Sequence, residues 1–222
     1  MAEQPTPPEE VFEPKEVFEF NGGRLCLDFI NTMRARPLSE RAESINEYGD
    51  LLSWARQATI LTPGEAAGVA EQARRHLRAA REALAQAVSL REALYSVLSA
   101  RAAGLPAPAT DLRTINRAIG KAMTRAGLAP GVGGRFEWDW PGSTPGLDRV
   151  TWWVTRSAAE LMTSLDITFV RECAGYDCGW LFMDATKNRS RRWCDMAACG
   201  NRAKGRRHYE RRRSARASLA RP

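Results

Sequence analysis

The sequence predicts a mainly α-helical protein with minor β-structure, in which a helical N-terminal domain precedes a small zinc-finger domain built as a treble-clef-like hairpin plus helix. Three observations lead to this prediction. Apolar residues recur at helical spacing through much of residues 17–165, four of the five cysteines cluster between residues 173 and 199, and basic residues concentrate around and after that cluster. A chain of 222 residues is long enough for one well-packed domain and a small second one.

The sequence divides into three segments. Residues 1–16 hold four prolines and five glutamates with few apolar residues, a composition typical of a disordered acidic tail. Residues 17–165 form the helical domain, and residues 166–222 form the zinc finger with its basic C-terminal helix. Because we find neither a signal peptide nor an apolar run of the ~20 residues that cross a membrane, we expect a cytoplasmic protein with no membrane partner.

The helical domain begins with segments of different character. In residues 17–20, Val-Phe-Glu-Phe, apolar and polar side chains partly alternate, which fits a short strand. Residues 24–32 are mostly apolar and fit either a strand or a buried helix, which periodicity alone does not decide. Residues 40–59 fit a helix, because Ile45 and Leu52 fall on one face at helical spacing.

The next helices have clear boundary signals. Residues 62–65, Thr-Pro-Gly-Glu, form a capping box, with threonine as N-cap, proline at the first helical position and glutamate three residues after the threonine. The alanine-, arginine- and leucine-rich stretch that follows predicts two helices, and the glycine- and proline-rich residues 104–108 end the second. Thr110 or Asp111 then caps a further helix that reaches Met123.

The last part of the helical domain combines loop, strand and helix. Residues 127–134 predict a loop, because glycines begin and end the segment. Residues 136–140 alternate with period two, as a strand does. Residues 149–164 carry apolar side chains at helical spacing and fit a helix packed on the core.

The cysteine cluster follows the pattern Cys-x4-Cys, then 15 residues, then Cys-x4-Cys. Zinc prefers four thiolates in a tetrahedron, and two closely spaced pairs bring the thiolates together with little loss of chain entropy. The gap between the pairs is usual for zinc modules, whereas the gap within each pair is wider than the commoner two residues. The predicted ligands of one zinc ion per chain are Cys173, Cys178, Cys194 and Cys199.

The residues around the cysteines favour a closed, structural site. Residues 169–173 and 179–183 fit the strands of a hairpin that presents the first pair, and Cys199 precedes a helix-favouring run, whose N-terminal dipole favours a thiolate. Four thiolates leave no open position for catalysis, and no Cys-x-x-Cys indicates a redox dithiol. The alternative is four free cysteines in a core. We expect Cys26 to be a small buried apolar residue rather than a redox group.

The net charge of +7 is unevenly distributed. Residues 186–222 hold 13 Lys/Arg and 2 Asp/Glu, a net of +11, whereas residues 1–185 hold 20 Lys/Arg and 24 Asp/Glu, a net of −4. Such an asymmetry points to an anionic partner, either nucleic acid or a membrane surface. A membrane-surface helix needs an apolar face, which the basic segment lacks, so we predict a nucleic-acid partner.

A helix that starts near Cys199 would align basic and aromatic side chains on one stripe, namely Arg202, Arg206, Tyr209, Arg213 and Arg216. Because no apolar face is available for packing, this helix needs the zinc at its start and a polyanion along its length, and we expect its end after about Arg213 to fray without a partner. In the preceding loop, Trp193 fits either stacking on a base or packing on the zinc site. The predicted nucleic-acid contacts are Arg189, Arg191, Arg192, Trp193, Asn201, Arg202, Lys204, Arg206, Arg207 and Arg213.

Two sequence motifs resemble known families. Residues 199–202 spell Cys-Gly-Asn-Arg and, with the other three clustered cysteines and the basic residues that follow, closely resemble the CGNR zinc-finger family of bacterial proteins over about residues 166–212. Residues 22–32, GGRLCLDFINT, resemble the ABATE domain that is often found before this finger. The resemblance implies a stress-induced transcription regulator whose helical domain senses a ligand and whose finger binds DNA.

The resemblance also draws attention to four polar residues. Asn201 and Arg202 directly follow a predicted zinc ligand and would support the site or contact the first phosphate, and Asn201 could also cap the helix. Asp28 and Asn31 lie three residues apart and, on a helix, could line a ligand pocket in the helical domain. The alternative for these two is a cap or a buried hydrogen-bonded pair.

Three functions stay open at this point. The first is a DNA-binding regulator with an unknown small-molecule effector, for which a homodimer would supply the contact area that one short basic module lacks. The second is an RNA-binding protein, because arginine and aromatic side chains serve single-stranded RNA equally well. The third is an enzyme that carries a structural zinc module. We expect no enzymatic activity, because the helical domain has one histidine, His76, and no recognisable nucleophile or phosphate loop, while the other histidine, His208, lies in the basic tail.

Overall fold

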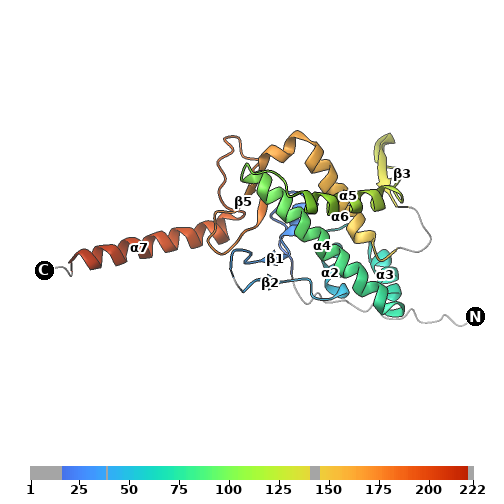
Figure 1. The fold of residues 1–222 in the computed structure, drawn as a ribbon, viewed down its shortest axis with the longest axis horizontal. Coiled ribbons are helices and arrows are strands. Elements are labelled where there is room, and N and C mark those ends of the chain that lie inside the picture. Colours follow the sequence, from blue (N-terminus) through green and yellow to red (C-terminus); the bar gives the residue numbers. More distant parts are fainter. Residues whose placement is uncertain (1–16, 39, 141–145, 220–222) are drawn as a thin grey trace, which may run out of the picture.

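The computed structural model describes residues 17–38, 40–140 and 146–219, and for residues 214–219 it describes the backbone alone. A helical body holds most of the chain, and the C-terminal helix projects away from it (Figure 1). The disorder predicted for residues 1–16 falls outside the described residues. Among the described helices, none combines the length and the apolar character that a membrane crossing requires.

Over the described residues the secondary structure is mainly helical, with three short antiparallel strand pairs, β1–β2, β3–β4 and β5–β6. The helices are α1 (Leu25–Ile30), α2 (Tyr48–Gln57), α3 (Pro63–Arg75), α4 (Leu77–Ala102), α5 (Ala109–Met123), α6 (Arg149–Thr163) and α7 (Asn201–Leu219). The strands are β1 (Met33–Arg34), β2 (Ala42–Glu43), β3 (Gly127–Pro130), β4 (Phe136–Asp139), β5 (Val170–Glu172) and β6 (Leu181–Met183). Short 3-10 segments cover Val132–Gly134 and Leu165–Phe169, and a π-helical turn covers Met196–Gly200.

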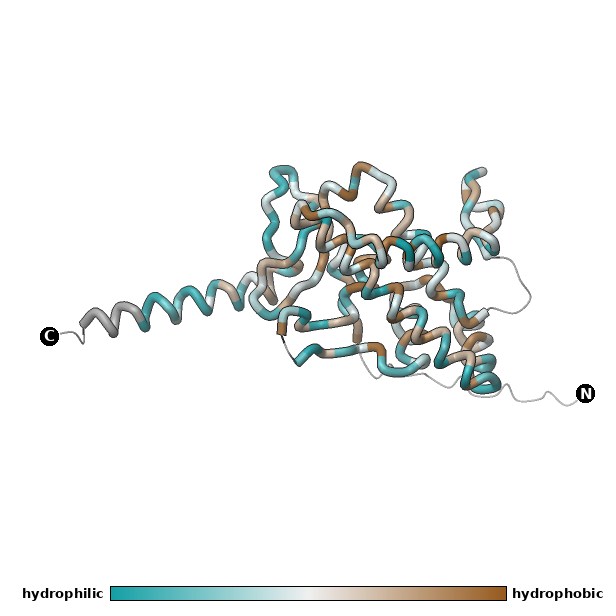
Figure 2. The backbone as a smooth tube through the Cα atoms, in the orientation of Figure 1, coloured by the Kyte–Doolittle hydropathy of each residue, from teal (hydrophilic) through white to brown (hydrophobic). Residues whose placement is uncertain are grey.

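Helix α4 is the central element of the body. It packs against α1, α2, α3 and α5, and also against both strands of the β5–β6 hairpin. Its buried side chains include Leu94 and Leu98, and α6 adds Val154 and Ala158 to the same core. Figure 2 shows apolar segments gathered within the body, whereas the described part of α7 is hydrophilic.

Local signals correctly predicted the start of α3. The Thr62 hydroxyl accepts a hydrogen bond from the Glu65 amide at 3.2 Å, and the Glu65 carboxylate accepts one from the Thr62 amide at 2.8 Å. Pro63 is the first residue of the helix. This reciprocal capping satisfies two backbone donors that the helix itself leaves unpaired.

The N-terminal elements correct two predictions and resolve one ambiguity. Residues 17–20 form no strand, because the Phe18 amide donates to the side chain of Gln57 rather than to a neighbouring strand. Residues 25–30 are the buried helix α1, not a strand. The helix predicted from residue 40 begins at Tyr48.

Pairing explains the shorter α2 and a further correction. Residues 42 and 43 pair with β1, which removes them from the predicted helix. The predicted loop at 127–134 is a strand over its first four residues, because β3 pairs with β4 and places Leu128 opposite Trp138. Helix α5 starts at Ala109 and has Pro108 at its N-cap position, so neither predicted residue caps it.

The β5–β6 hairpin is docked on the body. The Asn31 side-chain amide donates to the Leu181 carbonyl at 2.9 Å and accepts from the Leu181 amide at 3.0 Å. The Met183 amide donates to the Gly22 carbonyl at 2.8 Å, and Val170 and Leu181 lie in the same buried cluster as the body's helices. The hairpin therefore shares its core with the helical domain.

Candidate metal centre and nucleic-acid interface

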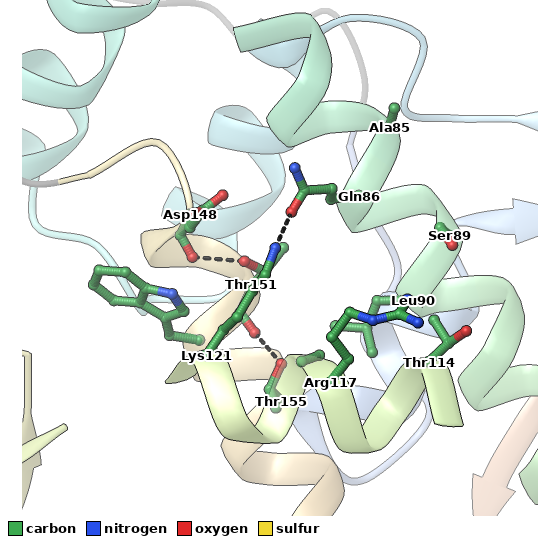
Figure 3. A pocket seen from close by; sticks show the side chains of 12 residues that line it. Ala85, Gln86, Ser89, Leu90, Thr114, Arg117, Lys121, Asp148, Thr151 and Thr155 are labelled. Carbon is green, nitrogen blue, oxygen red and sulfur yellow. Dashed lines mark hydrogen bonds between the residues drawn. The ribbon is translucent and has the colours of Figure 1, made fainter. Parts of the chain in front are cut away.

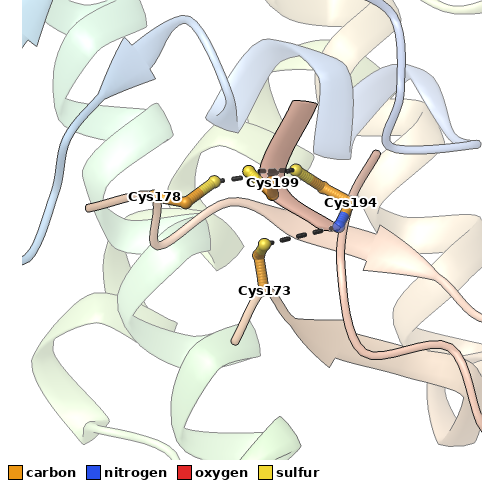
Figure 4. A group of neighbouring side chains, drawn as sticks. All are labelled: Cys173, Cys178, Cys194 and Cys199. Atoms are coloured by element: carbon orange, nitrogen blue, oxygen red, sulfur yellow. Dashed lines mark hydrogen bonds between the residues drawn. The ribbon is translucent and has the colours of Figure 1, made fainter. Parts of the chain in front are cut away.

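Four cysteines converge where β5, β6 and the start of α7 meet (Figure 4). All four thiols are buried, and their sulfur atoms lie within 4.8 Å of one another. The Cys194 sulfur lies 3.6 Å from the sulfurs of both Cys178 and Cys199. Tetrahedral zinc with Zn–S bonds of ~2.3 Å places sulfurs about 3.8 Å apart, so this group fits one zinc ion.

Glycines allow the chain to turn closely around the sulfurs. A Cβ atom at Gly175 would lie 3.1 Å from the Cβ of Cys178, which is tighter than ordinary contact. Gly179, directly after Cys178, has φ +70°, and a Cβ there would lie 2.9 Å from the Cβ of Arg36. A larger residue at either position would move the ligands or the body loop that supports them.

The electrostatics of the cluster call for a cation. The Cys173 sulfur accepts hydrogen bonds from the amides of Gly175 and Cys194, each at 3.4 Å. Hydrogen bonds from the Cys178 and Cys194 thiols and from these amides lower the pKa of Cys173 well below its usual range. The pKa values of Cys178 and Cys194 are raised, mainly by their hydrogen bonds to the Cys173 sulfur and then by burial, and that of Cys199 is raised mainly by burial and by the neighbouring Cys173 charge. A divalent cation removes the penalty of placing further negative charge there.

A small aromatic core surrounds the cysteines. Trp180 and Phe182 are buried against the four cysteines, and Trp193 is partly buried on the same cluster. The Trp180 indole also donates to the Met33 carbonyl of the body at 3.2 Å. Of the two interpretations of Trp193, packing on the metal site therefore describes its position.

The two polar residues of the Cys-Gly-Asn-Arg motif support the metal site. The Arg202 guanidinium donates to the Cys199 sulfur at 3.1 Å and lies 3.6 Å from the Asp177 carboxylate. The Asn201 side chain donates to the Ala197 carbonyl at 2.9 Å, which ties the π-helical turn to the first turn of α7. Arg202 helps to neutralise a thiolate, and Asn201 fixes the direction in which α7 leaves the site.

The three arginines of the loop before Cys194 occupy different environments. Arg191 turns inward, where it donates to the carbonyls of Trp193 and Cys194 and lies 4.6 Å over the Phe182 ring. Arg189 lies 4.2 Å over the Phe169 ring, and Arg192 lies 5.4 Å over the Trp193 ring. Both are on the exposed side of the loop. Arg191 is thus engaged by the protein's own backbone, whereas Arg189 and Arg192 face solvent.

The described side chains of α7 are almost all exposed and mostly basic. Its main contact is with the π-helical turn at its own start, and it projects into solvent (Figure 1). Arg206 lies 5.3 Å over the Tyr176 ring and 3.8 Å from the carboxylate of Glu210. The predicted stripe ends at Arg216, whose side chain lies outside the described residues. The exposed cations between 203 and 213 are Lys204, Arg206, Arg207, Arg211, Arg212 and Arg213.

Asp28 and Asn31, predicted as possible pocket residues, both make buried hydrogen bonds, and Asn31 also lines a small cavity of about 20 Å³. The buried Asp28 carboxylate accepts the Gly22 amide at 2.8 Å, and burial raises its pKa to about 6. The Asn31 side-chain amide is hydrogen-bonded to the backbone of Leu181. The two larger cavities, of about 410 and 480 Å³, have other linings. Both residues are therefore buried hydrogen-bonding groups that shape the body, and a role in ligand binding stays a prediction.

Sequence reasoning missed a buried charge network beside the metal site. Arg91, fully buried in α4, donates to the carboxylates of Glu43 and Glu92, and Arg36 also donates to Glu92. The Arg36 amide donates to the Cys178 carbonyl at 3.3 Å, which joins the network to the metal-binding turn. Glu43 lies 48 residues from Arg91, and Arg36 lies 56 residues from Glu92, so no local pattern could have indicated that they meet.

Cys26 lies away from the metal site. It is completely buried in α1, and burial raises the pKa of its thiol to about 12. A thiol held protonated in this way is unreactive, which agrees with the expected role as a small core residue.

Two family models match the chain in succession. The ABATE model, described as "Putative stress-induced transcription regulator", matches residues 23–165, and the CGNR zinc-finger model matches residues 170–212. A comparison with curated proteins finds none that matches. The cysteines that converge in the structure are those within the CGNR match, and the first match covers more than half of the chain. The chain therefore belongs to the ABATE family and carries a CGNR zinc finger that holds one zinc ion.

Proposed function

We propose that this protein is a DNA-binding transcription regulator in which zinc positions a basic recognition helix and the helical body senses a small-molecule effector. The observation that carries the proposal is α7, a helix of 19 residues that begins at the metal site and whose described side chains are almost entirely exposed. We further propose that the chain acts by binding rather than by catalysis.

The geometry of α7 suits a DNA groove better than packing on a protein core. Its 19 residues span about 28 Å, and its described part offers no apolar face. The major groove admits an α-helix, and arginine contacts both phosphates and guanine edges there. A single carboxylate, Glu210, offsets the cations of the described part, so repulsion between them is relieved best by a polyanion.

The metal site couples zinc to this helix. Cys199 lies in the π-helical turn directly before α7, and Arg202 in the first turn of α7 donates to its sulfur. Loss of the metal would remove the centre that holds the four cysteines together, and protonation of Cys199 would weaken its hydrogen bond from Arg202. The direction of α7 would then no longer be fixed relative to the loop that carries Arg189 and Arg192.

The candidate contacts thus separate into two groups. Arg191, Trp193, Asn201 and Arg202 hold the site together, and we propose that they act by positioning. The remaining candidates face solvent and would contact nucleic acid directly: Arg189, Arg192, Lys204, Arg206, Arg207 and Arg213, joined by Arg211 and Arg212. Because one short module gives limited specificity, we also propose that the protein binds its operator as a homodimer.

Salt dependence tests the proposal. Fluorescence anisotropy with a mixed-sequence DNA duplex should give a plot of log K against log salt with a slope of about −5, since six α7 cations would each displace counterions. Binding that is insensitive to salt, or absent at low salt, would contradict it. Competition with a structured RNA of equal length separates the two polyanions, and a clear RNA preference would replace DNA by RNA as the partner.

A further inference from the structure

A cavity of about 410 Å³ lies between α4, α5 and α6 (Figure 3). Its lining comes from residues 85–90 of α4, residues 114–121 of α5, and residues 148–155 at the start of α6. The volume falls within the range of natural small-molecule sites, and three helices of a folded body form its walls. The cavity contains neither Asp28 nor Asn31.

Part of the cavity lining is apolar and includes one aromatic side chain. Leu90 is buried to 3% exposure, and the Trp152 indole forms another part of the lining together with Ala118. Flat apolar groups are favoured against such a surface because they displace water from both the aliphatic side chains and the indole. This apolar part of the lining therefore favours a ligand with an aromatic or similarly flat part.

The charges of the lining are unbalanced. Arg117 and Lys121 lie one turn apart on α5, and Asp148 is the single carboxylate that lines the cavity among the residues that the structure describes. Lys121 donates to the neutral Gln86 side chain at 2.9 Å, as Figure 3 shows. Within the described part of the chain, Arg117 has no ion pair or hydrogen bond. Two cations without a paired carboxylate favour an anion at this rim.

We propose that this cavity binds a small aromatic carboxylate, with its ring against the apolar part of the lining, to which Leu90 and Trp152 contribute, and its carboxylate between Arg117 and Lys121. The role of this ligand as effector rests on the proposed regulatory function, whereas its binding does not. Helix α4 offers a route between this cavity and the metal site. Leu90 of the cavity lining is followed directly by Arg91 and Glu92, which belong to the charge network beside the metal-binding turn.

Calorimetric titration of the zinc-loaded full chain tests the proposal, with 2-naphthoate as probe and neutral 2-naphthamide as its matched control. We expect one 2-naphthoate per chain and much weaker binding of the amide. Arg117→Gln and Lys121→Gln should each weaken binding about fivefold, as the loss of a partly exposed charge pair does. Arg113→Gln, on the same helix but outside the cavity, should leave the affinity unchanged.

Two further substitutions test the location independently of charge. Ala85 is exposed at the cavity, so Ala85→Trp should block it and abolish binding, while Ala79→Trp on the same helix should not. Melting temperatures check that both variants are folded.

The basic helix α7 is the competing anion site, and Arg206→Gln combined with Arg207→Gln should leave naphthoate binding intact. The proposal is overturned if the probe does not bind at millimolar concentration, if the amide binds equally well, or if only the α7 variant loses binding. DNA affinity, measured separately, reports on the proposed function alone.

Discussion

Arginine serves opposite purposes in α4 and α7. In α4, Arg91 is fully buried, and its guanidinium is shared between the carboxylates of Glu43 and Glu92. In α7, Arg207 is exposed, as are its basic neighbours, and one glutamate serves the described part of the helix. The same side chain is therefore a structural element where carboxylates enclose it and a candidate ligand-binding group where they are absent. Environment rather than residue type separates the two roles.

The largest effect is expected at the junction of the two regions. Cys194→Ser should abolish zinc binding, since its sulfur lies 3.6 Å from two other ligands and three thiolates no longer close the site. DNA binding should fall to background because α7 loses its anchor. Elemental analysis measures the zinc content, and fluorescence anisotropy measures DNA binding. Cys26→Ser is the control, and a zinc content reduced by that change as well would contradict the assignment.

Arg91→Ala tests the structural half of the comparison. It leaves Glu43 without its buried partner and Glu92 with Arg36 alone, and it should lower the free energy of unfolding by about 3 kcal/mol, measured by urea denaturation. The matched control is Arg78→Ala on the same helix, where a side chain that is 94% exposed pairs with Glu82. That change should alter stability by less than about 0.5 kcal/mol. If the two substitutions lowered the free energy of unfolding equally, burial would not account for the different roles of the arginines.

Asp28 gives the body a pH-dependent contribution. Its pKa is raised from 3.8 to about 6 by burial, so ionisation penalises the folded state, and the penalty grows as pH rises from about 4 to about 6 and is complete above that. Asp28→Asn keeps an oxygen that can accept the Gly22 amide and should stabilise the protein by about 2 kcal/mol at pH 8. About half of that gain should remain at pH 5, where the folded carboxyl is already protonated. An equal gain at both pH values would exclude the raised pKa.

The smallest single effects are expected on α7. Arg207→Ala should weaken DNA binding about fivefold and lower the salt slope by about one, because one phosphate contact is lost. The unfolding free energy of this variant should stay unchanged.

Arg191→Ala, in the loop before Cys194, should instead lower the stability of the finger, since the Arg191 guanidinium donates to the carbonyls of Trp193 and Cys194. Identical stability profiles for the two variants would remove the distinction between positioning and contact residues.

Local patterns in the sequence predicted the features that depend on neighbouring residues. The spacing of the cysteines indicated the metal site, and Thr62 with Glu65 indicated the start of α3. Features that depend on distant partners were missed or misassigned. Asn31 meets Leu181 across 150 residues, and Arg36 reaches the turn after Cys173 only because the hairpin docks on the body. β3 was missed because its residues, Gly127–Pro130, show no alternation of polar and apolar side chains. The strand is defined by its pairing with β4.

The central claim is that zinc fixes α7 for DNA binding, and reversible metal removal tests it most directly. Zinc content and DNA affinity would be measured on one sample as purified, after chelation, and after zinc is added back. We predict one zinc per chain, loss of DNA binding on chelation and its recovery with zinc, while far-ultraviolet circular dichroism keeps the helical signal of the body. DNA binding that persists at full affinity in the metal-free protein would contradict the account.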